Sequence, residues 1–377
     1  MTYQRRRLAA RVFERVARFV TRLQAWPQRL TPPAFRLLQI GSAFWQSRAL
    51  HVAAKMDIAT ILGQRTLSAQ ELAKAVNGHP DSLCRLMRML VAMGVFDEPT
   101  PRAFRNNTLS AALRSDQPGS VRAMVLMHNS PEMSEPWFTQ LEEGIRSGTP
   151  PFQLAHGQTL FDYMDTHADF DAQFGAAMDS VDTLSGDSFA TEFNWSAFDR
   201  VIDVGGSKGA KSLAILKRHK HLTALVVDRP QIVEQAERYW REHAGAAALR
   251  PALSRLSFVA GDVFTNIPAA ESSRDVYLLS AVLHCFDDAT AQRALQNVAR
   301  QAGFAGATIA VLELVMPDRA DIASASFDMQ MLMGTRGRER TRDEWDALFA
   351  RSGVEYEETV DLMSFGKIMV LRPVAGS

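Results

Sequence analysis

Cysteine is scarce in this sequence, and nothing in its spacing suggests a disulfide framework or a zinc site. Cys84 and Cys285 are the two cysteines among 377 residues, and they form no CxxC pair. A disulfide framework needs several cysteines, and a structural zinc site needs clustered ones. The nine histidines show no metal-binding spacing such as HExxH. We therefore expect no metal site, and we expect a reducing cytoplasm as the location.

Net charge and long apolar runs are also lacking. Lys plus Arg and Asp plus Glu each number 42, so the formal net charge is zero. This balance argues against a nucleic acid or an anionic membrane as a partner held mainly by charge. No apolar run approaches the roughly 18 residues of a transmembrane helix, and no secretory signal is recognisable. With 46% hydrophobic and 22% charged residues, the chain is expected to form two or three globular domains.

Residues 1–30 are the first of four predicted segments and are unusually basic. They contain eight arginines and one acid, Glu14. Apolar residues recur at alternating steps of four and three from Val12 to Trp26, which predicts an apolar stripe along a helix. Packing of this helix against another subunit is the interpretation we favour. A membrane surface or an organelle address is the alternative.

Residues 31–118 have the pattern of a small helical domain with a hairpin. The spacing predicts a helix over 49–62, a second helix capped by Ser68, a third capped by Asp81, and two short strands within 95–105. Three helices followed by a hairpin describe a winged helix, a fold that often reads DNA. The third helix lacks a broad basic face, so DNA binding is kept only as a rival hypothesis.

Methionine and aromatic residues are concentrated in residues 119–195, which we predict to be helical. Such a stripe is typical of a core, but flexible methionines and flat rings also suit a pocket for a planar organic substrate. The sequence leaves both interpretations open. The pocket candidates in this segment are Trp137, Phe161, Phe174 and Met178.

Residues 196–377 alternate apolar runs with helical segments. Continuous apolar strands separated by helices indicate a parallel sheet that is buried on both faces. We predict a doubly wound α/β domain whose ligand binds at the carboxyl ends of the strands. The expected strands are 201–204, 223–227, 256–259, 276–279 and 308–314.

Three strand ends in this segment carry features of an adenosine site. The first strand runs into a glycine-rich turn, Asp203 to Gly209, which lacks the GxGxxG spacing of a pyrophosphate loop. Asp228 closes the second strand, where a carboxylate can accept two hydrogen bonds from a ribose diol. Asp262 closes the third strand, beside apolar Val263 and Phe264. Each feature alone is typical of an ordinary turn; together they favour an adenosine site without phosphates.

His284 directly follows a buried strand and is the candidate general base. Two acids near later strand ends, Glu313 and Glu339, can reach the same edge of the sheet. A carboxylate bonded to one imidazole nitrogen fixes the tautomer and leaves the other nitrogen free to take a proton. Nucleophilic catalysis is less well supported, because the sequence has no GxSxG motif and Cys285 has no evident partner.

These motifs resemble the caffeate/hydroxyindole class of S-adenosylmethionine-dependent O-methyltransferases, including bacterial natural-product members. The resemblance runs from about residue 35 to the C-terminus. It rests on DVGGxxG at 203–209, Asp228 with its following proline, GDxF at 261–264, the His284 segment, Glu313 and GxERT at 337–341. The combination is specific to the family, whereas each motif alone is weak evidence.

The resemblance implies a winged-helix-like dimerisation domain joined to a Rossmann-like class I methyltransferase domain, and therefore a homodimer that does not read DNA. His284 matches the family's general base, and Glu313 and Glu339 match the pair that holds it. Met331 joins Phe174 and Met178 among the residues expected at the acceptor. The residues expected at the cofactor, S-adenosyl-L-methionine, are Asp203, Gly205, Gly206, Asp228, Asp262, Val263, Phe264 and Ser280.

The chain departs from the family pattern beside the base. Cys285 and Phe286 follow His284 where the family usually has Asp and Trp, and Ser280 replaces a common lysine. We expect O-methylation of a hydroxyl on a small aromatic or enolic secondary metabolite. Transfer to nitrogen or to a carboxylate remains an alternative, as does a non-methylating tailoring reaction that keeps the cofactor.

Overall fold

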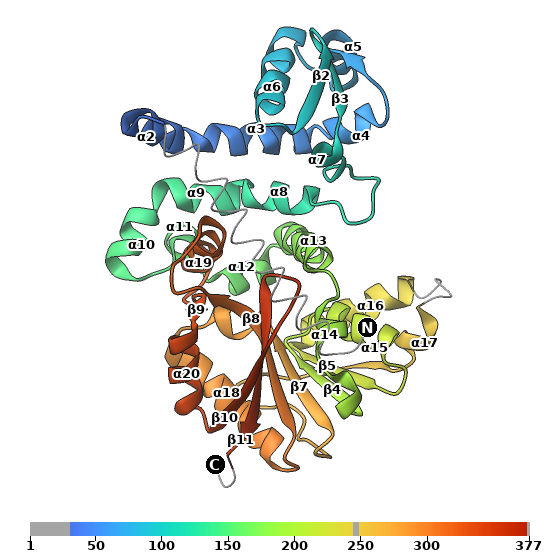
Figure 1. Ribbon diagram of the computed structural model, residues 1–377, viewed down its shortest axis with the longest axis vertical. Helices are drawn as coiled ribbons and strands as arrows, with labels where there is room; N and C mark the ends of the chain where they lie inside the picture. Colours follow the sequence, from blue (N-terminus) through green and yellow to red (C-terminus); the bar gives the residue numbers. More distant parts are fainter. Residues whose placement is uncertain (1–30, 244–248, 375–377) are drawn as a thin grey trace. The chain divides into compact units, whose positions relative to one another are not determined.

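The computed structural model describes residues 31–243 and 249–374, apart from the side chains of 182–185 (Figure 1). The predicted basic helix of residues 1–30 lies outside the described residues. The described chain divides into two compact units. We call residues 31–141 and 154–184 the helical unit, and residues 142–153 and 185–374 the sheet unit.

The N-terminal part of the helical unit holds five helices and a small sheet with strand order β1-β3-β2. Its helices pack around a core that includes Leu62, Leu72 and Met87. The strands are β1 (Leu67–Ser68), β2 (Phe96–Thr100) and β3 (Ala103–Asn106), and the helices are α2 (Pro33–Gly41), α3 (Ala43–Lys55), α4 (Ile58–Leu62), α5 (Ala69–Ala75) and α6 (Pro80–Ala92).

Two details differ from the prediction for this region. The single helix predicted over 49–62 is two helices, because Asp57 adopts a left-handed backbone conformation with φ of 53°. The third predicted helix is capped by His79, whose Nδ1 accepts the backbone N–H of Ser82, and not by Asp81. Pro80 takes the first helical position, where a missing N–H costs nothing. Ser68 caps α5 as predicted, in a reciprocal capping box with Glu71.

The remaining described segments before the large sheet are helical, as predicted. A proline at the first turn or a capping hydroxyl starts several of them, for example Ser130 before α9 and Thr159 before α12. The helices are α7 (Thr108–Ala111), α8 (Arg122–His128), α9 (Pro131–Thr139), α10 (Leu141–Ser147), α11 (Pro151–His156), α12 (Leu160–Thr166), α13 (Ala168–Ser185), α14 (Phe189–Glu192) and the 3₁₀ turn η1 (Trp195–Ala197).

The sheet unit is built on strands in the order β10-β11-β8-β7-β4-β5-β6, with β9 paired to the end of β8. Strands β4 to β8 are mutually parallel, as predicted. The prediction gave no strands beyond residue 314; at this C-terminal edge β11 runs antiparallel to β8 and β10. The strands are β4 (Arg200–Val204), β5 (Thr223–Asp228), β6 (Leu256–Ala260), β7 (Asp275–Ser280), β8 (Thr308–Met316), β9 (Arg340–Thr341), β10 (Val354–Asp361) and β11 (Gly366–Pro373).

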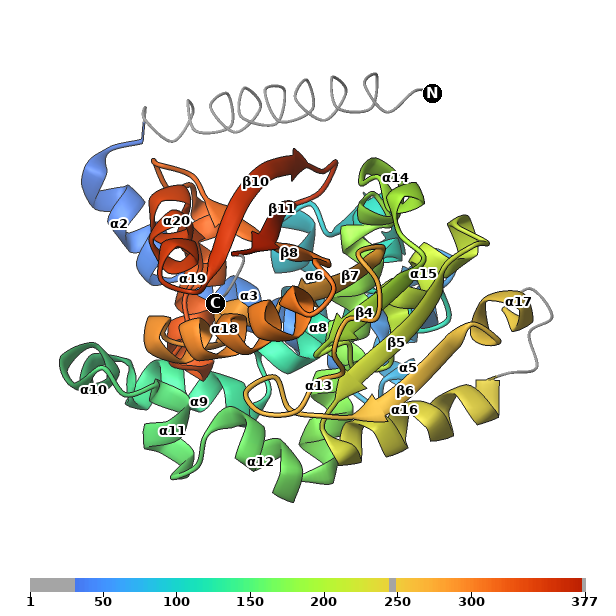
Figure 2. The ribbon, with the colours of Figure 1, turned by 90° about the horizontal axis from the view of Figure 1, so that it is seen from below.

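Helices cover both faces of this sheet, which explains the continuous apolar strands. Successive residues of a strand point to opposite faces, so Tyr277 belongs to the core with α18 and α20 while Val276 belongs to the core with α14 and α15 (Figure 2). The result is a doubly wound domain with all parallel strands ending at one edge. Its helices are α15 (Ala210–Arg218), α16 (Pro230–His243), α17 (Arg250–Leu253), α18 (Asp288–Gly303), α19 (Ile322–Gly334), α20 (Arg342–Ala350) and the 3₁₀ turn η2 (Leu283–Cys285).

Candidate active site

The turn after β4 is shaped by glycines that tolerate no side chain. A Cβ on Gly205 would lie 2.8 Å from the side chain of Val282, and one on Gly206 would lie 2.6 Å from the carboxylate of Asp203. Gly205 and Gly209 also have positive φ, near 70°, a conformation that glycine adopts without strain. The chain therefore makes a tight turn that leaves backbone close to any ligand at this strand end.

Asp228, the last residue of β5, is bound to this turn. Its Oδ2 accepts the backbone N–H of Ser207 at 2.8 Å, and its Oδ1 accepts the N–H of Arg229 at 2.8 Å. Burial raises the pKa of the Asp228 carboxyl, and these two N–H donors act in the opposite direction. Each carboxylate oxygen keeps a second lone pair, so the group can still accept two hydroxyl donors of a diol.

Asp262 follows β6 and sits in a short turn closed by Asn266. The backbone N–H of Asp262 is bonded to Asn266, and the Asp262 Oδ1 accepts the N–H of Phe264 at 2.8 Å. The Phe264 ring meets the Phe286 ring edge to face, with centroids 5.2 Å apart. An exposed carboxylate beside two aromatic rings is a suitable environment for a flat heterocycle with an amino group. The sequence had not assigned Phe286 to this place.

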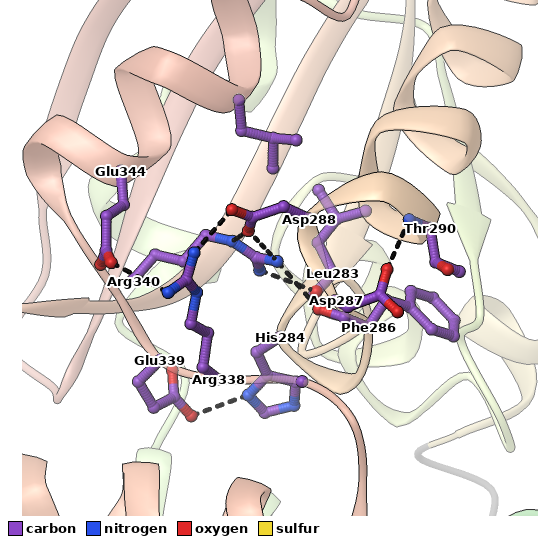
Figure 3. Close-up of polar contacts among 12 residues, drawn as sticks. Leu283, His284, Phe286, Asp287, Asp288, Thr290, Arg338, Glu339, Arg340 and Glu344 are labelled. Atoms are coloured by element: carbon purple, nitrogen blue, oxygen red, sulfur yellow. Dashed lines mark hydrogen bonds and ion pairs between the residues drawn. The ribbon is translucent and has the colours of Figure 1, made fainter. Parts of the chain in front are cut away.

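His284 lies in η2, just past the end of β7, and its ring faces a buried carboxylate (Figure 3). Its Nδ1 is 2.8 Å from Oε1 of Glu339, and the side chain is 16% exposed. Since the Glu339 carboxylate can only accept when ionised, Nδ1 carries the proton. The neutral ring then has its lone pair on Nε2.

Glu313, on β8, contributes differently from Glu339. Its Oε1 accepts the backbone N–H groups of Val282 and Leu283 at 3.0 and 2.9 Å. Its Oε2 lies 3.7 Å from Nδ1 of His284, and this oxygen has no hydrogen-bond partner among the described residues. Glu313 therefore holds the main chain that leads into His284 and adds negative charge beside the ring.

The electrostatics of this cluster favour a protonated imidazole. Burial by itself lowers the pKa of His284, but the carboxylate of Glu313, Cys285 and the hydrogen bond to Glu339 together raise it well above 6.5. Burial also raises the pKa of Glu313, and the nearby imidazole opposes that rise. The ring therefore has the driving force to accept a proton.

The structure brings most of the predicted site residues to one edge of the sheet. His284 contacts both Glu313 and Glu339, and the turn at Gly205 packs against Val282 of the same segment. Ser280 ends β7 at this edge, and Met331 lies on α19 of the sheet unit. Trp137, Phe161, Phe174 and Met178 belong to α9, α12 and α13 of the helical unit; their grouping around an acceptor stays a prediction.

Sequence reasoning gave no role to three residues that contact the His284 cluster. Asp328 on α19 accepts the backbone N–H of Glu339 at 2.9 Å. A Cβ on Gly337 would lie 1.8 Å from the carbonyl oxygen of His284, so only glycine fits there. Arg340 is fully buried beneath the same turn. The GxERT motif contained Gly337 and Arg340, and that was the one available signal.

The fold and this edge define a class: a Rossmann-like α/β domain with a glycine turn and acidic strand ends next to a carboxylate-supported histidine. Comparison with known proteins gives the family. Residues 138–355 match the O-methyltransferase domain, and residues 38–116 match the O-methyltransferase dimerisation domain. The chain belongs to this O-methyltransferase family, and its resemblance to natural-product methyltransferases is confirmed.

Curated relatives include both oxygen and nitrogen methyltransferases. The phenazine O-methyltransferase PhzM of Lysobacter antibioticus is 31% identical over 339 residues, covering 90% of this chain and 96% of that protein. The phenazine-1-carboxylate N-methyltransferase of Pseudomonas aeruginosa is 30% identical over 330 residues, covering 87% of this chain and 94% of that protein. The chain is therefore similar to methyltransferases of secondary metabolites, some of which methylate oxygen and others nitrogen.

Solved structures agree with this assignment. The crystal structure of LaPhzM matches with a TM-score of 0.81 and 29% identity, covering 91% of this chain and all of that one. NcsB1, solved with S-adenosylmethionine and 2-hydroxy-5-methyl naphthoic acid, matches with a TM-score of 0.71 and 28% identity, covering 87% and 96%. The predicted fold class is thereby confirmed.

The described part of the chain also lacks two other kinds of feature. No group of three or more His, Cys, Asp or Glu side chains there has the arrangement of a metal site. None of the helices in the described ranges is long and apolar enough to span a membrane.

Proposed function

We propose that this protein uses S-adenosyl-L-methionine to methylate a hydroxyl group of a small aromatic or enolic secondary metabolite, with His284 as the general base. The family supplies the reaction class. The observation that carries the finer assignment is the 2.8 Å contact between Nδ1 of His284 and Glu339, which leaves Nε2 as the proton acceptor.

The residues at the strand ends suit the cofactor. When bound, S-adenosylmethionine supplies an electrophilic methyl group on a cationic sulfur. Gly205 and Gly206 would let the main chain turn tightly beside its methionine part, because a Cβ at either position would collide with Val282 or Asp203 and open the turn. Asp228 would accept the ribose hydroxyls, and Asp262 with Phe264 would hold the adenine. Asp203, Val263 and Ser280 would complete this surface.

His284 would remove the acceptor's proton as the methyl group is transferred. A phenol has a pKa of about 10, so its neutral form is a weak nucleophile at pH 7. A base whose pKa lies above 6.5, as that of His284 does, is better matched to this proton. General-base catalysis of this kind contributes roughly 10²- to 10⁴-fold, and alignment of the reactants in a dry pocket adds more.

Replacement of His284 tests the proposal directly. We expect His284→Ala to lower turnover by at least about 10²-fold and to leave the affinity for S-adenosylhomocysteine unchanged. His221→Ala is the matched control, because His221 is exposed and precedes β5 at the opposite end of that strand. Mass spectrometry should show a product heavier by one CH₂ group together with S-adenosylhomocysteine. Near-full turnover in His284→Ala would remove the base assignment.

The N-methyltransferase among the relatives supports one second candidate, transfer to nitrogen. An amine already has a lone pair, so it needs little help from a base. The same variant separates the two cases when hydroxylated and amine-bearing naphthoates and phenazines are screened side by side. Loss of turnover in His284→Ala supports a hydroxyl acceptor, and retention on an amine substrate supports nitrogen.

We also propose that the protein acts as a homodimer through its N-terminal helices. The match to the dimerisation domain begins at residue 38. Helix α2 has no buried residue, and Phe35, Leu38 and Trp45 on α2 and α3 are each at least 60% exposed. Apolar area of this extent is typical of a subunit interface. Sedimentation at micromolar concentration should give twice the 41.8 kDa chain mass; a monomer would contradict the proposal.

A further inference from the structure

Arg340 is a fully buried cation directly behind the histidine turn (Figure 3). Its Nη1 donates to the carbonyl oxygen of Leu283 at 3.0 Å, and its Nη2 donates to that of Phe286 at 2.8 Å. Its Nε donates to Oδ1 of Asp288 at 3.0 Å, and the guanidinium lies over the ring of Trp345. Each of its three nitrogens therefore donates to a specific acceptor.

The two carbonyl acceptors flank His284 in the chain. Leu283 precedes the histidine and Phe286 follows it by two residues, so one planar guanidinium spans the whole of η2. Arg340 also directly follows Glu339 in the chain, and the Glu339 carboxylate accepts the hydrogen bond from Nδ1–H of His284. The main chain of the base and the main chain of its carboxylate partner are thus joined through one rigid side chain.

We propose that Arg340 is a positioning residue that fixes the distance and angle between His284 and Glu339. Only the expected effect on turnover rests on the proposed function of His284. The geometry itself is independent of which acceptor is methylated. Because a misplacement of about 1 Å can cost about 10²-fold in rate, a loosened turn reduces catalysis without touching the cofactor residues.

Neutralising Asp288 does not explain why Arg340 is buried. Arg338 and Arg351 also pair with Oδ2 of Asp288, at 2.6 and 3.2 Å, from side chains that are about 45% exposed. Neither donates to the carbonyls of the histidine turn. A lysine at position 340 can keep the charge, but it lacks the planar fork of donors that serves a carboxylate and two separate carbonyls.

Arg340→Lys is the test, with Arg338→Lys as its matched control on the same carboxylate. Both are made in the full-length chain labelled with ¹⁵N-histidine, and the His284 signal is identified by its loss in His284→Gln. In Arg340→Lys we expect the His284 titration to move from its raised position toward 6.5, because the contact with Glu339 loosens. In Arg338→Lys it should match the unaltered protein. Calorimetry with S-adenosylhomocysteine should give the same affinity in Arg340→Lys, Arg338→Lys and the unaltered protein.

Turnover supplies the second readout. With an acceptor found in the screen, Arg340→Lys should lower kcat by about 10- to 100-fold and leave the KM for S-adenosylmethionine unchanged. A protein that merely needs Arg340 for stability would instead show a lower unfolding midpoint with normal kcat in the folded fraction. If Arg340→Lys fails to fold, Asp288→Asn takes its place. Asp288→Asn keeps the hydrogen bonds from Arg340 to the carbonyl oxygens of Leu283 and Phe286 but weakens the contact at Nε. We therefore expect a smaller shift of the His284 titration.

The outcomes separate this inference from the proposed function. A folded Arg340→Lys protein with the original His284 titration and original kcat overturns the positioning role, as does an unchanged titration in Asp288→Asn when that variant is the one used. If the titration shifts but His284→Ala keeps its turnover, Arg340 positions the ring and the base assignment fails. If His284→Ala is inactive and Arg340→Lys changes neither readout, the base assignment stands and the positioning role fails.

Discussion

Two strand ends of the same sheet hold their polar side chains in different ways. Asp228, at the end of β5, is bound by backbone N–H groups of the next residue and of the glycine turn 21 positions earlier. His284, beyond β7, is bound by acids that lie 29 and 55 positions later in the chain. The first end joins a carboxylate to the turn of the neighbouring strand through main-chain groups, whereas the second is assembled from η2, β8 and the segment 337–340.

This difference sets how each end responds to damage. The Asp228 end depends on two main-chain hydrogen bonds to one side chain, so a substitution there alters ligand binding first. The histidine end depends on packing between η2, β8 and the segment 337–340, so a disturbance in any of them reaches the imidazole. We therefore expect substitutions at the Asp228 end, called the cofactor end below, to lower ligand affinity. Substitutions at the His284 end, called the histidine end, should lower the turnover rate.

Gly337→Ala should have the largest effect on turnover, because it distorts the main chain at the histidine end. The added methyl would lie 1.8 Å from the carbonyl oxygen of His284 and 2.5 Å from the carbonyl carbon of Cys285. These are main-chain atoms, so the turn itself must move, and we expect turnover to fall by about 10²-fold with a lower unfolding midpoint.

The control for Gly337→Ala is Gly303→Ala at the end of α18. Its Cβ would meet one side-chain atom at an ordinary 3.8 Å. Assays at matched concentrations of folded protein should show normal turnover there. Equal turnover in both variants would mean that the turn tolerates displacement, and the contrast drawn between the two strand ends would be lost.

Asp228→Asn should have an intermediate effect, which is a loss of ligand affinity at the cofactor end. The amide NH₂ would face one of the two N–H donors now bound by the carboxylate, and the charge that strengthens the ribose hydrogen bonds would be gone. Losing hydrogen bonds to a charged group costs about 1.5–3 kcal/mol, or about 10- to 100-fold in affinity. Calorimetry with S-adenosylhomocysteine measures this change directly.

Asp199→Asn is the matched control for Asp228→Asn. Asp199 is exposed, precedes β4, and pairs with Arg274 at the opposite end of the sheet. Its substitution should leave the affinity unaltered. If Asp228→Asn binds S-adenosylhomocysteine as tightly as this control, Asp228 does not hold the ribose.

The smallest effect is a pH dependence at the histidine end that the cofactor end lacks. Glu313, Cys285 and Glu339 raise the pKa of His284 against the effect of burial, so kcat/KM for the acceptor should rise with pH through a limb above 6.5. The same raised pKa adds stability that is complete below about pH 6.5 and lost as pH rises through the folded-state value.

Comparison with His284→Gln isolates that contribution. The difference in unfolding midpoint between the two proteins should shrink as pH rises above 6.5. Glu313→Gln should move the kcat/KM limb toward lower pH, since it removes the carboxylate that contributes most to the raised pKa. A limb at the same pH in Glu313→Gln would show that Glu313 acts on the main chain alone.

Much of the fold was predictable because its signals are local. The strand of 276–279 is apolar throughout and that of 201–204 is apolar except for Asp203, as burial on both faces requires. The antiparallel C-terminal edge escaped prediction because apolar β patterns carry no direction. The cap of α6 escaped it because a histidine ring replaced the usual acid or hydroxyl.

The candidate site divides along the same line. Asp228 and the glycine turn could each be predicted from their positions at strand ends. The hydrogen bond between Asp228 and Ser207 joins residues 21 positions apart and follows from the pairing of β4 with β5. Glu313 and Glu339 could be named as acids at later strand ends, yet only the structure separates their contacts: Glu339 to the ring, Glu313 mainly to backbone N–H groups. The contacts of Arg340 could not be predicted from the sequence, because two of its partners are backbone carbonyl oxygens, which every residue has.

The sequence by itself determined the alternation of strand and helix, the acids and the histidine at the strand ends, and the family to which the chain belongs. It could do so because hydrophobic period, turn chemistry and short motifs act over a few residues. Tertiary structure alone decided which carboxylate oxygen meets Nδ1 of His284 and which main-chain groups meet a buried guanidinium. Those contacts join segments more than fifty residues apart, and only the packing of the sheet and its helices sets the distances between them.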